Sequence, residues 1–137
     1  MFNYLIKIEY EGTNFVGWQS QKNGKSIQDS IEKALKKILG SKIKIIGAGR
    51  TDKGVHAYSQ VANFKIKKKI DNKKIFLDSV NFFLKNKFIS ILDIKKQKDD
   101  FHARFSAKLR TYEYLIINRQ GTLSIFKNKA WHVKKKN

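Results

Sequence analysis

The sequence predicts an α+β fold in which an antiparallel sheet carries two helices on one of its faces. Three observations predict it. Short segments alternate apolar and polar residues with a period of two, as half-buried strands do. Two longer segments place apolar residues at helical spacing behind a capping residue. These segments follow one another in the order β-α-β-β-α-β, with more β after them, which is typical of helices packed on an antiparallel sheet.

The first strand is predicted from Tyr4 to Tyr10. Aromatic and isoleucine side chains occupy one of its faces, and Lys7 and Glu9 lie on the other. This alternation is expected of a strand with one buried face. A loop rich in Gly and Asn follows from Glu11 to Gly24, and its Trp18 is predicted to pack in the core rather than to border a binding site.

The first helix is predicted from its caps and its stripe. Ser26 is a suitable N-cap, and Asp29 stands three residues later in the capping-box position. Gly40 is a suitable C-terminal stop. Five apolar residues at helical spacing form the stripe that should face the core: Ile27, Ile31, Ala34, Leu35 and Ile38.

The remaining elements complete a split βαβ, ferredoxin-like order. A second helix should begin near Asn72 and end around Asn86, and it should bury Ile75, Phe76, Val80, Phe83 and Leu84. No internal repeat or linker divides the chain, so residues 1–137 are expected to form one domain. The lysine runs at 67–69, 73–74 and 134–136 are most simply solvated ends of elements. The further strands are predicted at Lys42–Ile46, Gln60–Ile66, Phe88–Ile94, Thr111–Ile117 and Ala130–Val133.

The net charge of +19 indicates a polyanionic partner. Thirty basic residues stand against eleven acidic ones, which favours nucleic acid over an anionic membrane, although the lysine-rich composition accounts for part of the charge. No apolar run approaches the ~20 residues of a membrane span. The sequence has no Cys, which excludes disulfides and thiol chemistry and favours a cytoplasmic location. Only four basic residues are Arg, which suggests a need for the planar guanidinium at Arg50, Arg104, Arg110 and Arg119.

The segment from Gly47 to Ala57 is the first that carries chemistry. Its three glycines allow a tight turn and close approach of a ligand to the backbone. Asp52 stands between Arg50 and Lys53, and these cations favour the ionised carboxylate that a nucleophile or a base needs. The alternative is a structural turn that Asp52 merely caps, and the spacing alone favours it.

The segment from Asp99 to Tyr114 is the second that carries chemistry. It interleaves basic and aromatic residues, as in single-strand platforms where aromatic rings stack on bases and cations contact phosphates. The alternative is a strand whose aromatic residues pack in the core, and Phe101, Phe105 and Tyr114 fit both interpretations equally. The three histidines have no metal-ligand spacing, so neither a metal nor another cofactor is predicted.

Both segments resemble the tRNA pseudouridine synthase A family. The run Gly-Arg-Thr-Asp-Lys-Gly-Val-His-Ala at 49–57 is similar to the family's signature loop. The run Asp-Phe-His-Ala-Arg-Phe-Ser-Ala at 100–107 is similar to a second family motif, which a Tyr-x-Tyr strand follows, as at 112–114 here. Residues 9–12 and 15–19 resemble the family's first strand and loop more weakly. The resemblance extends from about Tyr4 to Trp131.

The resemblance implies a pseudouridine synthase fold and the isomerisation of uridine to pseudouridine in the anticodon stem-loop of tRNA, at tRNA positions 38 to 40. It implies that Asp52 is the catalytic residue, either as a nucleophile or as a base. It implies that Arg50 fills the space that the flipped-out uridine leaves, and that Tyr112 contacts the flipped base. The same resemblance places one stretch against the RNA: Phe101, His102, Ala103, Arg104 and Phe105.

Members of the family are about twice as long and form homodimers. Their C-terminal half supplies a basic partner for the catalytic Asp, so the present chain alone is expected to be inactive. Lys53 stands where many members have a small residue, and it should add a phosphate contact.

The alternative function is a non-catalytic basic RNA-binding module, such as a ribosomal protein or an RNA-recognition domain. The anionic Asp52 and the missing RNA-recognition signature count against this alternative.

Overall fold

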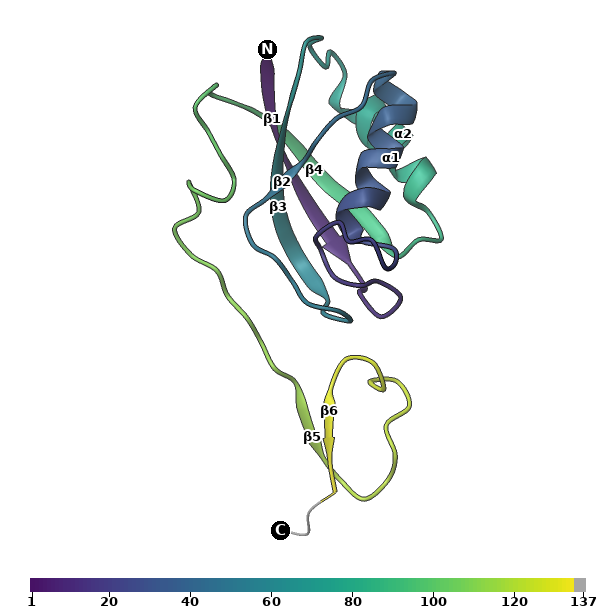
Figure 1. Cartoon of the computed structure of the whole chain (residues 1–137). Helices are drawn as coiled ribbons and strands as arrows, with labels where there is room; N and C mark the ends of the chain where they lie inside the picture. The colour runs from purple at the N-terminus through teal and green to yellow at the C-terminus, as the bar shows by residue number, and fades with distance from the viewer. Residues whose placement is uncertain (135–137) are drawn as a thin grey trace.

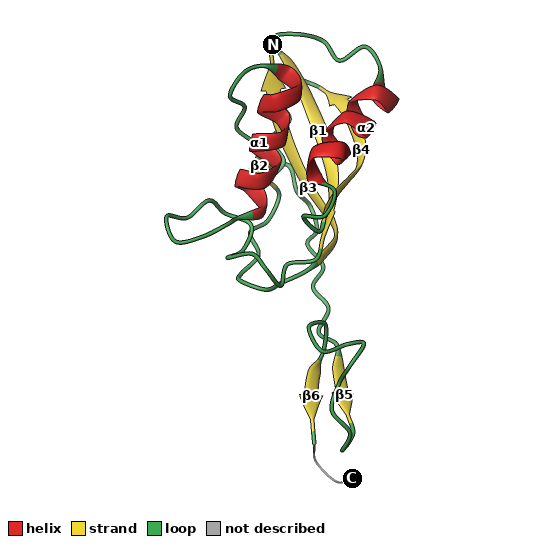
Figure 2. Ribbon diagram, turned by 90° about the vertical axis from the view of Figure 1, so that its right-hand side faces the viewer, coloured by secondary structure: helices red, strands yellow, loops and turns green. Residues whose placement is uncertain are grey.

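The computed structural model describes residues 1–134, and its main sheet has four strands covered by two helices (Figures 1 and 2). The strand order is β2-β3-β1-β4, and every neighbouring pair is antiparallel. Both helices lie on the same face of this sheet. The elements of this α/β body are β1 (Phe2–Tyr10), α1 (Ile27–Leu39), β2 (Ile46–Gly47), β3 (Ala57–Ile66), α2 (Lys73–Leu84) and β4 (Ile89–Gln97).

The core lies between the sheet and the helices. The predicted inward face of β1 is confirmed, because Tyr4, Ile6, Ile8 and Tyr10 are all buried. Opposite them β3 contributes Phe64, whose ring centroid lies 6.0 Å from that of Tyr4. Period-two alternation therefore decides which side of the sheet receives the helices.

Helix α1 begins and ends at the predicted caps. The Ser26 hydroxyl accepts a hydrogen bond from the Asp29 amide at 3.0 Å. Gly40 adopts a left-handed φ of 77° and donates its amide to the Lys36 carbonyl at 2.9 Å. The predicted stripe is buried from Ile27 to Leu35, and Ile38 is half-buried against the core.

Helix α2 begins after the predicted cap, Asn72, whose side chain accepts from the Ile75 amide at 3.0 Å. The predicted burial of Ile75 is wrong, because its side chain is 63% exposed. Residues four apart form the buried stripe, namely Phe76, Val80 and Leu84, and Ile75 falls on the neighbouring face with the exposed Phe82.

Two predicted strands are largely wrong. Of Lys42–Ile46 only Ile46 pairs with β3, although Ile43 and Ile45 are buried. The reason is that side chains of α1 bind this backbone: Glu32 accepts from the Ile45 amide at 3.0 Å and Gln28 donates to its carbonyl at 3.3 Å. Of Thr111–Ile117 only Ile116 and Ile117 belong to a strand. Residues 111–115 are exposed, and within residues 1–134 no strand lies beside them with which they could pair.

Strand β4 begins one residue later than predicted and runs three residues further. Phe88 stands before it with a left-handed φ of 62° and an exposed ring. The predicted strand at Ala130–Val133 appears as β6 (Trp131–Val133), which pairs in parallel with β5 (Ile116–Asn118). Figures 1 and 2 show this pair standing apart from the main sheet as an arm. The last two lysines of the predicted 134–136 run lie outside the described residues.

Two buried asparagines attach a later segment to the face of the sheet opposite the helices. The Asn3 amide donates to the carbonyls of Lys98 and Phe101, each at 2.9 Å. Asn63 donates to the Asn3 side-chain oxygen at 3.1 Å and accepts from the Ala103 amide at 2.8 Å. Each asparagine is only 1% exposed, so these bonds are shielded from water. They place the second motif on the sheet.

No helix among residues 1–134 has the length and apolarity to cross a membrane.

Candidate active site and RNA-binding surface

The motif loop between β2 and β3 is bound to the body at several points. The Ala48 amide donates to the Val61 carbonyl at 2.8 Å, and Gln60 donates its side-chain amide to the Gly49 carbonyl at 2.6 Å. Further along, the Trp18 amide donates to the Thr51 carbonyl at 3.0 Å. The loop is therefore held on both sides of Arg50 by the strands and by the loop that follows β1.

The loop that follows β1 packs closely on the motif loop. A Cβ at Gly12 would lie 2.0 Å from the Val55 carbonyl oxygen, and one at Gly47 would lie 2.7 Å from the Trp18 ring. Only a residue without a side chain fits these two positions. Trp18 is 3% exposed, which confirms that it packs in the core.

Replacing Gly12 with Ala should destabilise the protein, because the new methyl group would overlap a backbone oxygen that the rest of the loop fixes. We expect the free energy of unfolding to fall by about 1–3 kcal/mol in a denaturant titration. Gly121→Ala is the matched control, since the nearest atom to its added Cβ is 4.0 Å away, in the Arg119 side chain. Equal stability of the two variants would contradict the close packing described for Gly12.

Asp52 lies at the exposed end of this loop. Its backbone carbonyl accepts from the Val55 amide at 3.1 Å, and Gly54 has a left-handed φ of 78°, so residues 52–55 form a turn. The carboxylate makes no hydrogen bond or ion pair within residues 1–134, neither with the backbone nor with the flanking Arg50 and Lys53. The backbone thus closes the turn by itself, and the carboxylate is open to an incoming ligand.

The buried phenol of Tyr10 lies against the loop. The hydroxyl groups of Tyr10 and Thr51 are hydrogen-bonded at 2.8 Å. Burial raises the pKa of the Tyr10 phenol above its ordinary value, the bond with Thr51 acts in the opposite direction, and the nearby Tyr112 phenol adds to the rise. Tyr10 therefore stays protonated across the neutral range and serves as a fixed hydrogen-bonding support for the residue before Asp52.

The two motifs meet at an open pocket of 450 Å³. Its lining includes Arg50 from the first motif and Arg104, Phe105 and Tyr112 from the second, and Gly47, Ala48 and Gly49 form the backbone side. Cationic and aromatic side chains around exposed backbone suit a nucleotide, whose phosphate and base they can contact separately. Asp52 does not line this pocket and lies two residues beyond Arg50 along the loop.

Arg110 holds the motifs together, and its role is not apparent from the sequence. Its Nε donates to the Ala48 carbonyl at 2.8 Å, and its Nη2 donates to the Arg104 carbonyl at 2.9 Å. A guanidinium can make both bonds at once, which an ammonium cannot do in this fixed fork. The scarcity of Arg in a lysine-rich chain is the one signal that marks this position.

The remaining predicted residues lie on the attached segment. His102 and Phe105 stack with ring centroids 4.3 Å apart, and Phe105 is 81% exposed, as a platform for a base would be. Phe101 is half-buried. Ala103 is buried, and its amide binds Asn63, so it anchors the segment. Contact of these residues with RNA remains a prediction. Tyr114, which fits both a core position and a platform, is 90% exposed.

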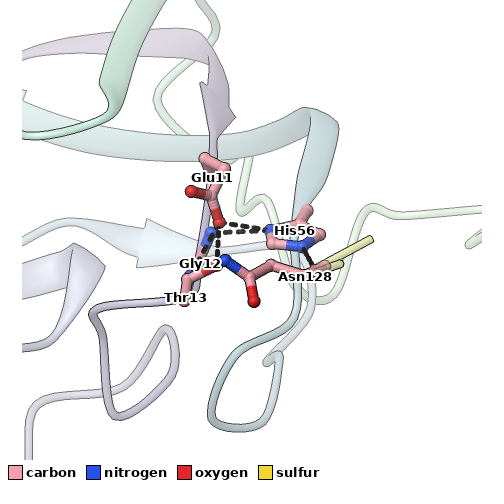
Figure 3. A network of polar contacts seen from close by, with 5 residues as sticks. All are labelled: Glu11, Gly12, Thr13, His56 and Asn128. Carbon is pink, nitrogen blue, oxygen red and sulfur yellow. Dashed lines mark hydrogen bonds and ion pairs between the residues drawn. The ribbon is translucent and has the colours of Figure 1, made fainter. Parts of the chain in front are cut away.

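His56, the last polar residue of the first motif, joins three segments (Figure 3). Its Nδ1 accepts from the Gly12 amide at 2.8 Å and lies 3.1 Å from a carboxylate oxygen of Glu11. Its Nε2 contacts the Asn128 carbonyl in the loop of the arm. Hydrogen bonds from Thr13 lower the pKa of the Glu11 carboxyl, which stays ionised beside this ring.

Comparisons with known proteins show the family of the chain. The profile of a tRNA pseudouridine synthase family matches residues 6–106. A tRNA pseudouridine synthase A of Pelagibacter ubique is 53% identical over 136 residues, which cover 99% of this chain and 55% of the relative. Proteins of the same description from Caldicellulosiruptor saccharolyticus and Thermoanaerobacter sp. are 48% and 44% identical, over 96% and 97% of this chain. The chain spans about half the length of these relatives. It belongs to the tRNA pseudouridine synthase family.

Proposed function

We propose that this chain supplies the catalytic carboxylate and one wall of the RNA site in a tRNA pseudouridine synthase. The observation that carries the proposal is the pocket in which Arg50 meets Arg104, Phe105 and Tyr112. Residues more than fifty positions apart in sequence converge there, and Asp52, whose carboxylate has no partner within residues 1–134, follows Arg50 by two residues in the same loop. A ligand that needs cations, aromatic rings and a carboxylate together is a nucleotide undergoing reaction at its base.

In the proposed reaction Asp52 acts on a uridine that has left its helix. It attacks the ring as a nucleophile or abstracts a proton as a base. The N-glycosidic bond breaks, the uracil rotates, and a bond forms between its C5 carbon and the ribose. C5 then loses its proton to water and the nitrogen of the broken bond gains one, so that the product is an isomer of the substrate. Arg50 fills the vacated space, and Tyr112 contacts the extruded base. Extrusion costs a few kcal/mol, which contacts with the protein must offset.

The strand order β2-β3-β1-β4 with two helices on one face supports a ferredoxin-like arrangement as the fold of this half. A target in the anticodon stem-loop and a homodimeric whole protein are parts of the proposal that rest on the family resemblance alone. A cytoplasmic location is a further part, which rests on the absence of Cys from the sequence.

The test joins this chain to the part of the Pelagibacter ubique relative that its 136 aligned residues do not cover. We expect the chimera to release tritium from 5-labelled uridine in unmodified tRNA, and residues 1–137 alone to bind tRNA weakly without release. An exposed Asp52 without an opposing wall is poorly positioned, and a small misplacement costs about 10²-fold in rate. A folded chimera that binds tRNA but releases no tritium would favour the non-catalytic RNA-binding module.

A further inference from the structure

A second concave surface lies at the end of the body away from the motif loop. It is an open groove of 690 Å³ between the C-terminal end of α1, the end of β3 and the first turn of α2. Five lysines line it: Lys42, Lys65, Lys67, Lys68 and Lys69. Apolar side chains of α1, α2 and the β3–α2 connection form its floor, among them the exposed Ile75. We call this surface the lysine groove.

The lysines of the groove have no anionic partners in the part of the chain that the structure describes. Within residues 1–134 none of the five forms an ion pair, whereas the adjacent Lys73 and Lys74 are paired with Asp93 and Asp78 at 2.5 and 2.8 Å. Asp71 is the acidic residue of the lining, so one negative charge faces five positive ones. Such an uncompensated cluster repels itself and attracts a polyanion.

The lysine groove and the motif loop lie at opposite ends of β3 (Figure 1). The strand runs from Ala57, which follows the motif loop, to Ile66, which lines the groove. Its ten residues span ~30 Å at the usual rise of a strand. A ligand that occupies both places must therefore be long.

One edge of the body links the two places. Residues 42–50 run along the outer side of β3, where Ile46 and Gly47 pair with it. Lys42 and Ile43 line the groove at the start of this segment, Lys44 is exposed, and Gly47 to Arg50 line the pocket at its end. A chain of phosphates that follows this edge meets cations from the groove to Arg50.

We propose that the lysine groove is a second RNA-binding surface, which holds a part of the tRNA outside the stem-loop that enters the candidate site. This inference rests on the proposed function. The groove contacts the phosphate backbone and therefore adds affinity without reading sequence. An isolated stem-loop seated at the motif loop would be too short to reach it, so the groove would distinguish a whole tRNA from a fragment.

The test compares two variants of the 137-residue chain that lose equal charge. The groove variant is Lys67→Gln/Lys68→Gln/Lys69→Gln. The control is Lys33→Gln/Lys37→Gln/Lys85→Gln, whose three lysines are exposed on the helix side and do not line the groove. Circular dichroism checks that both are folded. Each is titrated at several salt concentrations with whole unmodified tRNA and with its isolated anticodon stem-loop.

We expect the groove variant to bind whole tRNA about tenfold more weakly at low salt and to lose roughly 0.7–0.9 in log–log salt slope per phosphate contact removed. Its binding of the stem-loop should match that of the control. Lys42→Gln, on the opposite wall of the groove, should give a smaller loss in the same direction. The inference would be overturned if the two triple variants lost equal affinity for whole tRNA, or if the groove variant lost equal affinity for the two RNAs. It would also be overturned if the groove variant lost as much affinity for polyglutamate, a polyanion that is not RNA.

A fourth variant separates this inference from the proposed function. Arg104→Gln removes a cation from the candidate site, so it should weaken the binding of both RNAs alike. If it weakens the binding of neither RNA, the proposed site is wrong. The comparison of the two triple variants still decides whether the groove binds tRNA.

Discussion

Asp52→Asn in the chimera should abolish pseudouridine formation and leave tRNA affinity within a few fold. The amide keeps the size of the carboxylate but is neither a nucleophile nor a base, so the rate should fall by at least about 10²-fold. The fold should tolerate the change, because the turn at 52–55 is closed by backbone groups and the Asp52 side chain has no partner within residues 1–134. Tritium release measures turnover, and a salt-matched titration measures affinity.

Asp78→Asn is the control for this experiment. It removes the same charge from an exposed position on α2, where the ion pair with Lys74 at 2.8 Å contributes little to stability. We expect turnover like that of the parent chimera. Substantial turnover by the Asp52 variant would remove Asp52 from the reaction, whichever of the two mechanisms applies.

Asn63→Ala should cause the largest loss of stability among single changes on the face opposite the helices. The truncation leaves the Ala103 amide and the Asn3 side-chain oxygen without their partners in a shielded place. Each such group costs about 1–3 kcal/mol. Because the segment that Asn63 anchors carries Arg104 and Phe105, tRNA affinity should fall together with the free energy of unfolding.

Chemical denaturation and tRNA titration of the same preparation measure the two effects. Asn23→Ala is the control, since Asn23 is exposed in the loop before α1 and its change should alter neither quantity. An Asn63 variant that unfolds within about 0.5 kcal/mol of the parent would show that water replaces the lost bonds and that the segment is held by other contacts.

The elements that the sequence predicts correctly are those whose signals are local. Ser26 caps the start of α1 and Gly40 caps its end, through hydrogen bonds to residues three or four positions away. The alternation of β1 depends on the strand alone. The segment Lys42–Ile45 looks like a strand for the same local reason. It is not one, because Glu32 and Gln28 from α1 bind the Ile45 backbone groups that a neighbouring strand would bind.

The candidate site also has residues that the sequence identifies and contacts that it does not reveal. The motifs identify Asp52, Arg50 and Tyr112 by resemblance, and the catalytic role of Asp52 stays a prediction. The sequence does not reveal how the motifs meet, because the Arg110 bonds to Ala48 and Arg104 join residues that are 62 and 6 positions away. Asn3 and Asn63 are equally hidden, since a polar residue on the outward face of a strand is ordinary.

The asparagine pair also bears on how β1 and β3 select their alignment during folding. A slip of one residue would turn the isoleucines of β1 outward, so the apolar pattern excludes it. A slip of two residues keeps every side chain on its own face, and the apolar pattern does not penalise it. A slip that pairs Asn3 with Lys67 would, however, separate the Asn3 oxygen from the Asn63 amide, now 3.1 Å apart, and leave both polar groups buried without partners. The pair thus distinguishes the native pairing from one of the two slips that hydrophobicity alone tolerates best.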